Sequence, residues 1–107
     1  MTYKRVDDNQ TRIVKDLREA GMTVQHLHNV HGGCPDIVVG YKGKNYMFEI
    51  KRDKVAKLTP DQVIWHHNWQ GQVNIIITSE EAINAIKQEA KKAEKVSTKD
   101  ASTNDQA

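Results

Sequence analysis

The residues best suited to chemistry lie on the two stretches that flank the dipeptide Lys42-Gly43. Asp36 begins the first stretch, and Glu49 and Lys51 lie at the end of the second. If Lys42-Gly43 is a two-residue hairpin loop, with glycine supplying a positive φ, Asp36 faces Glu49 across the two strands. Opposed residues have Cβ atoms about 5 Å apart. Two carboxylates at that separation repel each other unless a cation lies between them.

The alternation of apolar residues supports this pairing. The expected partners are Tyr41 with Lys44, Gly40 with Asn45, Val39 with Tyr46, Val38 with Met47, and Ile37 with Phe48. Successive side chains of a strand point to opposite faces, so one face receives only apolar or aromatic residues. These residues are Ile37, Val39, Tyr46, Phe48 and Ile50. The other face receives Asp36, Glu49 and Lys51 together.

A hard divalent cation is the natural occupant between the two carboxylates. Mg²⁺ prefers carboxylate oxygens and water, usually with one or two protein carboxylates. We expect Asp36, Glu49 and the backbone carbonyl of Ile50 to supply three ligand positions. A bound metal lowers the pKa of its water, and Lys51 could orient that water or stabilise charge on a phosphate oxygen. This pattern indicates phosphodiester hydrolysis; the alternative is a solvated Glu-x-Lys ion pair worth under about 1 kcal/mol.

Two glutamines lie where each could reach this site. Gln10 shares the apolar face of the first expected helix with Val14 and Leu17, either as a boundary amide or as a site residue. Gln62 is the third residue after Thr59 at the start of a later helix, where it would complete a capping box. The capping role and a role in the site both stay open for Gln62, because the capping face can also face the site.

The rest of the sequence predicts the elements that must position these residues. Helices are expected from Asp7 or Asp8 to Gly21, from Thr59 to Gly71, and from a Ser79 cap to about Lys91. Strands are expected over residues 23–28, 36–41, 45–51 and 73–78, the last of them buried. The order α-β-β-β-α-β-α joins an antiparallel hairpin to a β-α-β crossover. It predicts an α/β fold with a single mixed β-sheet flanked by helices.

Composition limits the class of protein. The chain has 107 residues, of which 37% are hydrophobic and 28% charged, and this suits one soluble domain. No apolar run approaches the roughly 20 residues of a membrane helix, so no membrane partner is expected. A net charge of +2 permits a nucleic-acid partner without requiring one. Residues 1–91 are expected to form the domain and residues 92–107 a disordered tail, because the tail has too little apolar surface to offset its ordering entropy.

A histidine cluster and a lone cysteine are interpreted as structural. His26 and His28 share a strand face, but no nearby cysteine pair or HExxH pattern supports a zinc site. Cys34 lies beside the proposed site without an evident acid–base partner, so an inert thiol is expected. One cysteine forms no intramolecular disulfide, which is consistent with a reducing cytoplasm.

Three ordered segments resemble a known family. They are Gly33-Cys34-Pro35-Asp36-Ile37-Val38-Val39-Gly40, Phe48-Glu49-Ile50-Lys51, and Leu58-Thr59-Pro60-Asp61-Gln62 followed by Trp65-His66. Together they are similar to the virus-type replication–repair nuclease (VRR-NUC) domain of the PD-(D/E)xK superfamily, from about Asp7 to Ile86. The resemblance is to stand-alone phage-type members. It implies a restriction-endonuclease-like core and a cytoplasmic protein encoded by a bacterium or phage.

The resemblance implies a metal-dependent DNA endonuclease that acts in DNA repair. Asp36, Glu49 and the Ile50 carbonyl would bind Mg²⁺ or Mn²⁺. Lys51 would be the catalytic lysine, and Gln62 would be the later helical glutamine of the site. Gln10 stands near the place where the family's first helix often offers a glutamate, so a second metal has one carboxylate fewer to hold it. Stand-alone members are associated with homodimers that cut branched DNA, including four-way (Holliday) junctions.

A basic stretch follows the hairpin loop and continues past the site. Its cations are Lys42, Lys44, Lys51, Arg52, Lys54 and Lys57, against only Glu49 and Asp53. Beside a phosphodiesterase site, we expect Lys42, Lys44, Arg52, Lys54 and Lys57 to contact the DNA backbone. The alternative is a solvated loop.

Two other classes of function stay open. One is a non-catalytic DNA-binding module that keeps the nuclease fold, and the other is a small interaction subunit that binds a protein through its tryptophans. The helix after Pro60 carries Val63, Ile64, Trp65 and Trp69, and no single stripe holds all four. A helix that is apolar on more than one side needs more than one partner. We therefore expect a two-fold dimer with Trp65 or Trp69 in its interface.

Overall fold

The computed structural model describes residues 8–105, and the side chains of residues 8–94. The elements are α1 (Asp8–Glu19), β1 (Thr23–His26), β2 (Ile37–Tyr41), β3 (Lys44–Ile50), α2 (Pro60–Asn68), β4 (Asn74–Ile76) and α3 (Ser79–Asp105). Their order is the predicted α-β-β-β-α-β-α. Most boundaries differ from the predicted ones by one to three residues, as fraying element ends commonly do.

The strands form one mixed sheet in the order β1-β2-β3-β4. β1, β2 and β3 are antiparallel neighbours, and β4 runs parallel to β3 after the crossover through α2. The hairpin register is the predicted one, from Ile37 opposite Phe48 to Tyr41 opposite Lys44. Lys42 and Gly43 form the connecting turn, both with positive φ, as a two-residue hairpin loop requires.

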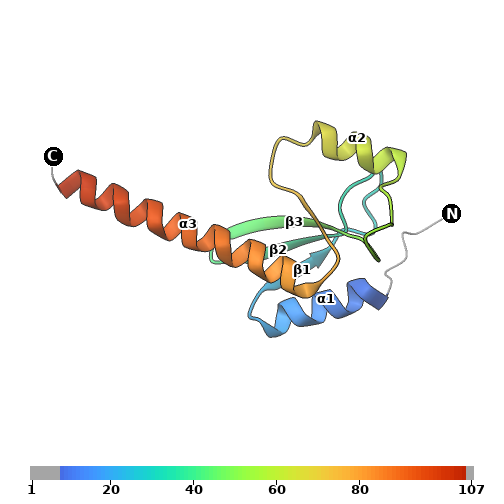
Figure 1. The fold of residues 1–107 in the computed structure, drawn as a ribbon, viewed down its shortest axis with the longest axis horizontal. Coiled ribbons are helices and arrows are strands. Elements are labelled where there is room, and N and C mark those ends of the chain that lie inside the picture. Colours follow the sequence, from blue (N-terminus) through green and yellow to red (C-terminus); the bar gives the residue numbers. More distant parts are fainter. Residues whose placement is uncertain (1–7, 106–107) are drawn as a thin grey trace.

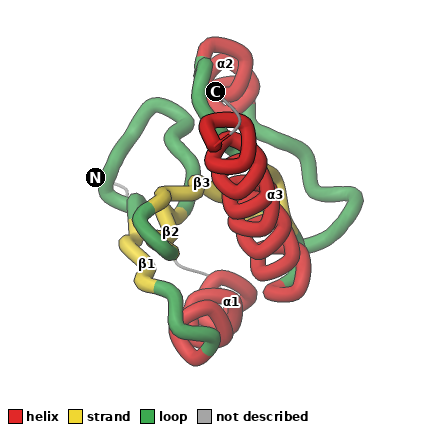
Figure 2. The backbone as a smooth tube through the Cα atoms, turned by 90° about the vertical axis from the view of Figure 1, so that its left-hand side faces the viewer, coloured by secondary structure: helices red, strands yellow, loops and turns green. Residues whose placement is uncertain are grey.

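The two faces of the sheet are covered differently. α1 and the first turns of α3 lie together against one face, and α2 lies over the other (Figure 1). Figure 2 shows the same layers from the side, with α2 and α1 at opposite ends of the view. The core fills the layer between the sheet and the α1–α3 pair. Its members include Ile13, Val14, Leu17, Ile37, Val39, Tyr46, Phe48, Ile50, Ile76, Ala82 and Ile86.

The start of α3 corrects the predicted cap. Thr78, and not Ser79, caps the helix, because Thr78 Oγ1 accepts from the backbone N–H of Glu81 at 3.2 Å. Glu81 Oε1 accepts from the Thr78 N–H at 3.1 Å in return, which completes a capping box. Ser79 instead donates its hydroxyl to Asp16 of α1. This contact joins the two helices that cover the core.

The last strand is shorter and more exposed than predicted. β4 contains three residues, and only Ile76 is buried, whereas Ile75 is 47% exposed. β4 is an edge strand that pairs on one side only, and Ile75 lies beside Glu49 on the α2 side, away from the apolar core. The prediction of a buried strand over residues 73–78 is therefore wrong for most of that segment.

The last helix is longer than predicted. Its expected end was about Lys91, and α3 continues to Asp105. The division into a folded unit of residues 1–91 and a dispensable tail stays a prediction. No helix of the described chain is both long enough and apolar enough to span a membrane.

Candidate active site

Asp36, Glu49 and Lys51 lie at the same end of the two central strands of the sheet. Asp36 immediately precedes β2, and its N–H donates to the Phe48 carbonyl of β3 at 3.1 Å, which continues the hairpin ladder by one residue. Glu49 lies at the end of β3, and Lys51 follows that strand. The three side chains therefore gather on the α2 side, opposite the apolar face that packs against α1 and α3.

The two carboxylates are buried although they lie outside the apolar core. Glu49 is 2% exposed and Asp36 is 9% exposed. Asp36 Oδ2 accepts from the backbone N–H of Ile50 at 2.7 Å, so this carboxylate lies directly against the end of β3. The structure thus brings Asp36 against the Ile50 N–H, at the end of the strand that carries Glu49. The roles of Asp36, Glu49 and the Ile50 carbonyl as metal ligands stay predictions.

Gln62 connects the remaining members of the site. Its Nε2 donates to Glu49 Oε2 at 3.0 Å, and its Oε1 accepts from Lys51 Nζ at 2.9 Å. The Lys51 ammonium also donates to the Lys57 carbonyl at 3.1 Å and lies 4.0 Å from Glu49 Oε2. A single amide from α2 therefore separates and orients an acidic and a basic group, which fixes the position of the lysine charge relative to the carboxylate.

The same glutamine also caps α2. Thr59 Oγ1 accepts from the Gln62 backbone N–H at 3.3 Å, and Gln62 Oε1 accepts from the Thr59 N–H at 2.9 Å. The two roles left open by the sequence are thus combined in one side chain. Capping directs Gln62 back over the first turn of α2, and this turn faces the sheet edge.

The Gly32-Gly33 loop packs closely against the first turn of α2. Both glycines have positive φ, and a Cβ atom at Gly33 would collide with the backbone of Asp61 and Gln62. Only glycine allows the loop before Asp36 to approach the first turn of α2 so closely. The segment that delivers Asp36 and the helix that delivers Gln62 are thereby held together.

His66 lies one turn beyond Gln62 on the same helix and is half-buried. Its pKa is lowered from the ordinary value of 6.5, mainly by burial and further by the Lys51 charge. Its Nε2 atom is buried and has no hydrogen-bond partner within the described part of the chain. A neutral imidazole therefore lies near Lys51 at the border of the site. His66 belongs to the third sequence segment of the resemblance but was assigned no role.

Asn9 is a residue of this region that sequence reasoning missed. Its Nδ2 donates at 3.0 Å both to the Lys51 carbonyl and to the Ile77 carbonyl. One side chain from the first turn of α1 thus joins the ends of the β3 and β4 segments beneath the site. No sequence signal identifies such a contact, because its partners are backbone groups distant in the chain.

Gln10 is buried on the core side of α1, at 3% exposure. Its Nε2 lies 3.0 Å from His26 Nδ1 of β1, which shows the boundary-amide role left open by the sequence. A further role as a metal ligand stays a prediction.

The basic stretch is divided by the fold. Arg52, Lys54 and Lys57 lie in the loop between β3 and α2, directly after the site. Lys42 and Lys44 lie at the hairpin tip, about 16 Å away along β2 at roughly 3.3 Å per residue. Lys42 there pairs with Glu94 of α3 at 3.7 Å. The two groups cannot contact the same phosphate.

The donor set of the site fits a hard divalent cation. Asp36 and Glu49 provide two buried carboxyl groups beside the ammonium of Lys51. No group of three or more His, Cys, Asp or Glu side chains suited to a metal occurs in the described chain. Mg²⁺ commonly uses one or two protein carboxylates and completes its shell with water, so two carboxylates and the Ile50 carbonyl suffice.

Comparison with solved structures relates this arrangement to a known domain. The chain matches a solved "VRR_NUC domain" with a TM-score of 0.59 and 22% sequence identity. The match covers 76% of this chain and 97% of the other. No protein-family model matches the sequence. No curated protein matches it either.

The chain therefore has the VRR_NUC fold, as the three sequence segments predicted. This is an α/β fold with a single mixed sheet of four strands and flanking helices. The likeness extends over nearly the whole of the matched domain. At this level of identity the comparison shows the fold, and the function is argued from the site itself.

Proposed function

We propose that this protein is a divalent-metal-dependent DNA endonuclease. The observation that carries the proposal is the network in which Gln62 bridges Glu49 and Lys51 beside Asp36, on a VRR_NUC fold. Two buried carboxylates and a fixed lysine are the groups that phosphodiester hydrolysis requires. An ordinary surface ion pair needs neither the burial nor the bridging amide.

Each residue has a distinct role in this proposal. Asp36, Glu49 and the Ile50 carbonyl would hold Mg²⁺ or Mn²⁺, which supplies a water of lowered pKa and neutralises charge on the phosphate. Lys51 stabilises the negative charge that develops on the phosphate oxygens. Gln62 is a positioning residue that keeps Lys51 and Glu49 apart and oriented. In the reaction, a water oxygen bonds to phosphorus, one P–O ester bond breaks, and the leaving oxygen takes a proton.

We propose that the nucleic acid approaches from the loop between β3 and α2. Arg52, Lys54 and Lys57 are exposed there and are available to backbone phosphates. Lys42 and Lys44, at the far hairpin tip, would contact a more distant part of a duplex or a second arm of branched DNA. We also propose that the protein acts in a reducing cytoplasm, where Cys34 remains a thiol.

We further propose that the substrate is branched DNA, such as a four-way junction, cut by a homodimer. The support is the uncovered apolar surface of α2, where Val63 is 52%, Ile64 60% and Trp69 44% exposed. Trp65 stacks on Trp69 at 4.6 Å between ring centroids, which gives this surface a flat aromatic centre. A second copy would cover the surface, and a two-fold dimer would present two equivalent sites to a symmetric junction.

A substrate panel tests the catalytic proposal. Labelled linear duplex, flap and four-way-junction DNA are incubated with the full chain, with Mg²⁺ or with EDTA. We expect cleavage that requires the metal and is fastest on the branched substrates. Binding in EDTA without cleavage in Mg²⁺ would instead support a DNA-binding module, and neither activity would support a protein-interaction subunit. Sedimentation at micromolar concentration tests the dimer, which a species with the mass of one chain would contradict.

A further inference from the structure

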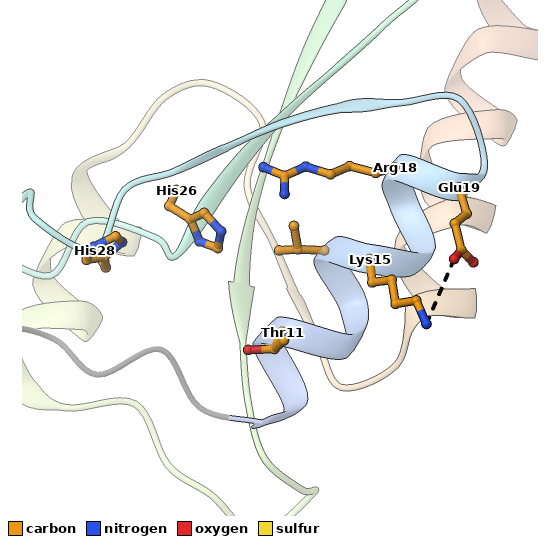
Figure 3. Close-up of a pocket in the computed structure, with 7 residues that line it drawn as sticks. Thr11, Lys15, Arg18, Glu19, His26 and His28 are labelled. Atoms are coloured by element: carbon orange, nitrogen blue, oxygen red, sulfur yellow. Dashed lines mark ion pairs between the residues drawn. The ribbon is translucent and has the colours of Figure 1, made fainter.

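An open cavity lies on the opposite side of the sheet from the candidate active site. It has a volume of about 510 Å³ and lies between α1 and β1. The lining residues are Thr11, Val14, Lys15, Arg18, Glu19, His26 and His28 (Figure 3). Most of the polar groups in this lining are donors or cations. The one acidic residue, Glu19, pairs with Lys15 at 4.0 Å.

Two imidazoles and a guanidinium give the cavity its character. His26 and His28 lie edge to face with ring centroids 5.6 Å apart, and Arg18 extends from α1 toward His26 (Figure 3). Arg18 Nη2 donates to the Val24 carbonyl at 3.2 Å, which anchors one of its donors and leaves the others for a further acceptor.

The hydrogen bonding of His26 makes it a donor toward the cavity. The amide nitrogen of Gln10 lies 3.0 Å from His26 Nδ1, and an amide nitrogen only donates. Nδ1 therefore accepts, and a neutral imidazole then carries its proton on Nε2. Burial first, and then His28 and Arg18, lower the pKa of His26 from its ordinary value, which favours the neutral ring.

His28 lines the same cavity beside His26. Its Nδ1 atom is buried and has no hydrogen-bond partner within the described residues, so any contact with a ligand comes from another edge of the ring. A metal ion does not suit this cavity, because Arg18 and Lys15 repel a cation. An oxyanion suits it, because it would accept from the imidazoles, the guanidinium and the Thr11 hydroxyl.

The cavity lies at the same end of the sheet as the candidate active site. His26 pairs with Ile37, and the Leu27 N–H donates to the Asp36 carbonyl at 2.8 Å. The cavity and the candidate active site therefore lie one strand apart at this end of the sheet, on opposite faces. We infer that this cavity is a second phosphate-binding site, formed by Arg18, His26 and His28 with Lys15. The phosphate could belong to the DNA backbone, to a DNA end or to a free phosphate ion, and the experiment below distinguishes these three sources.

Titration of the full chain with inorganic phosphate, in EDTA, tests the site without any DNA. The imidazole signals of His26 and His28 are followed by NMR in the wild type, in Arg18→Gln and in His28→Gln. Arg12→Gln is the matched control, because Arg12 is an exposed arginine of α1 that does not line the cavity. We expect phosphate to shift the His26 signal in wild type and in Arg12→Gln, and to shift it much less in Arg18→Gln. Thermal unfolding of each variant verifies that the fold is kept.

DNA binding in EDTA then identifies the source of the phosphate, and this arm rests on the proposed function. Arg18→Gln and Lys15→Gln are compared with Arg12→Gln on a duplex with 5′-hydroxyl ends and on the same duplex with 5′-phosphates. A loss of about 3- to 10-fold on both duplexes, with the salt slope reduced by about one, identifies a backbone phosphate. A loss confined to the phosphorylated duplex identifies a terminal phosphate, and a phosphate-induced shift without any effect on DNA identifies a free phosphate.

The inference is overturned if phosphate leaves the His26 and His28 signals unchanged, whatever Arg18→Gln does to DNA affinity. The nuclease proposal and the cavity can fail separately. If the protein cleaves no DNA but shows the phosphate-induced shift, the proposed function is contradicted and the phosphate site is supported. If it cleaves branched DNA without the shift, the proposed function is supported and the phosphate site is contradicted.

Discussion

The two faces of the sheet use different means of holding a helix. On the α1–α3 face, buried aliphatic and aromatic side chains form one continuous apolar layer. On the other face, α2 has no buried residue and is held by the Gln62 network and the close approach of Gly33. Stability therefore resides mainly on the first face and the candidate chemistry on the second. Substitutions on the two faces should separate the two properties.

The largest expected effect is on the α2 face. Glu49→Gln and Asp36→Asn remove a carboxylate charge from the proposed metal site while keeping its shape. Cleavage should fall to background, whereas the melting temperature should be kept or raised, because two neighbouring carboxylates no longer repel each other. Metal-dependent cleavage of labelled DNA measures the first effect and thermal unfolding the second. Glu89→Gln, on the exposed side of α3, is the control. Full activity in Glu49→Gln or Asp36→Asn would contradict the proposal that these carboxylates bind the metal.

Next in size is the contrast in stability between two helical isoleucines. Ile86 of α3 is 0% exposed and Ile64 of α2 is 60% exposed. Ile86→Ala should lower the free energy of unfolding by about 2–5 kcal/mol, and Ile64→Ala by no more than about 0.5 kcal/mol. Denaturant unfolding at two protein concentrations measures both. Equal losses would show that α2 contributes to the core, and a concentration-dependent loss in Ile64→Ala would place it in a dimer interface.

Lys51→Ala should reduce the cleavage rate more than DNA binding. The ammonium acts on charge that develops in the transition state, so the rate at saturating DNA should fall by about 10²-fold or more. Affinity should change by only about one phosphate contact. Lys57→Ala, which keeps the carbonyl that holds Lys51, serves as the comparison for a binding lysine. Normal cleavage with poor binding in Lys51→Ala would make Lys51 a binding residue.

A smaller effect is expected from pH. The pKa of His66 is lowered in the folded chain by burial and then by Lys51, so below about pH 6.5 the unfolded chain takes up the proton more readily. The stability linked to His66 is therefore present above pH 6.5 and is lost as the pH falls toward the lowered value. His66→Gln should show a smaller drop in melting temperature between pH 7.5 and 5.5 than wild type. His67→Gln, an exposed neighbour, should respond as wild type does; the reverse pattern would contradict this account.

The smallest effect is expected at the chain end. Truncation after Lys91 removes the Lys42–Glu94 ion pair, whose side chains are 59% and 68% exposed. Exposed pairs contribute little, so the melting temperature should fall by less than about 4 °C. Glu94→Gln in the full chain isolates the ion pair from the rest of the deleted segment. A drop of many degrees on truncation alone would show that residues 92–107 belong to the folded unit.

The sequence predicted best where a structural signal was local. The hairpin register followed from Lys42-Gly43 and strict alternation, and the α2 start followed from Thr59 and Gln62. It failed where the environment decided the outcome. The run at Ile75 and Ile76 indicates a buried strand, but its edge position leaves Ile75 exposed. Thr78 and Ser79 are both good caps, and contact with Asp16 of α1 draws Ser79 away from that role.

For the site, the sequence by itself determined which carboxylates and which lysine share a sheet face. Alternation in a two-residue hairpin allows only one register that buries the apolar set, and that register brings Asp36 beside Glu49. Only the tertiary structure decided how these groups are held. Gln62 reaches Glu49 and Lys51 because Gly33 lets α2 approach, and Asn9 joins Lys51 to Ile77 across the chain. Such contacts depend on the packing distance between elements, which no local pattern of residue types encodes.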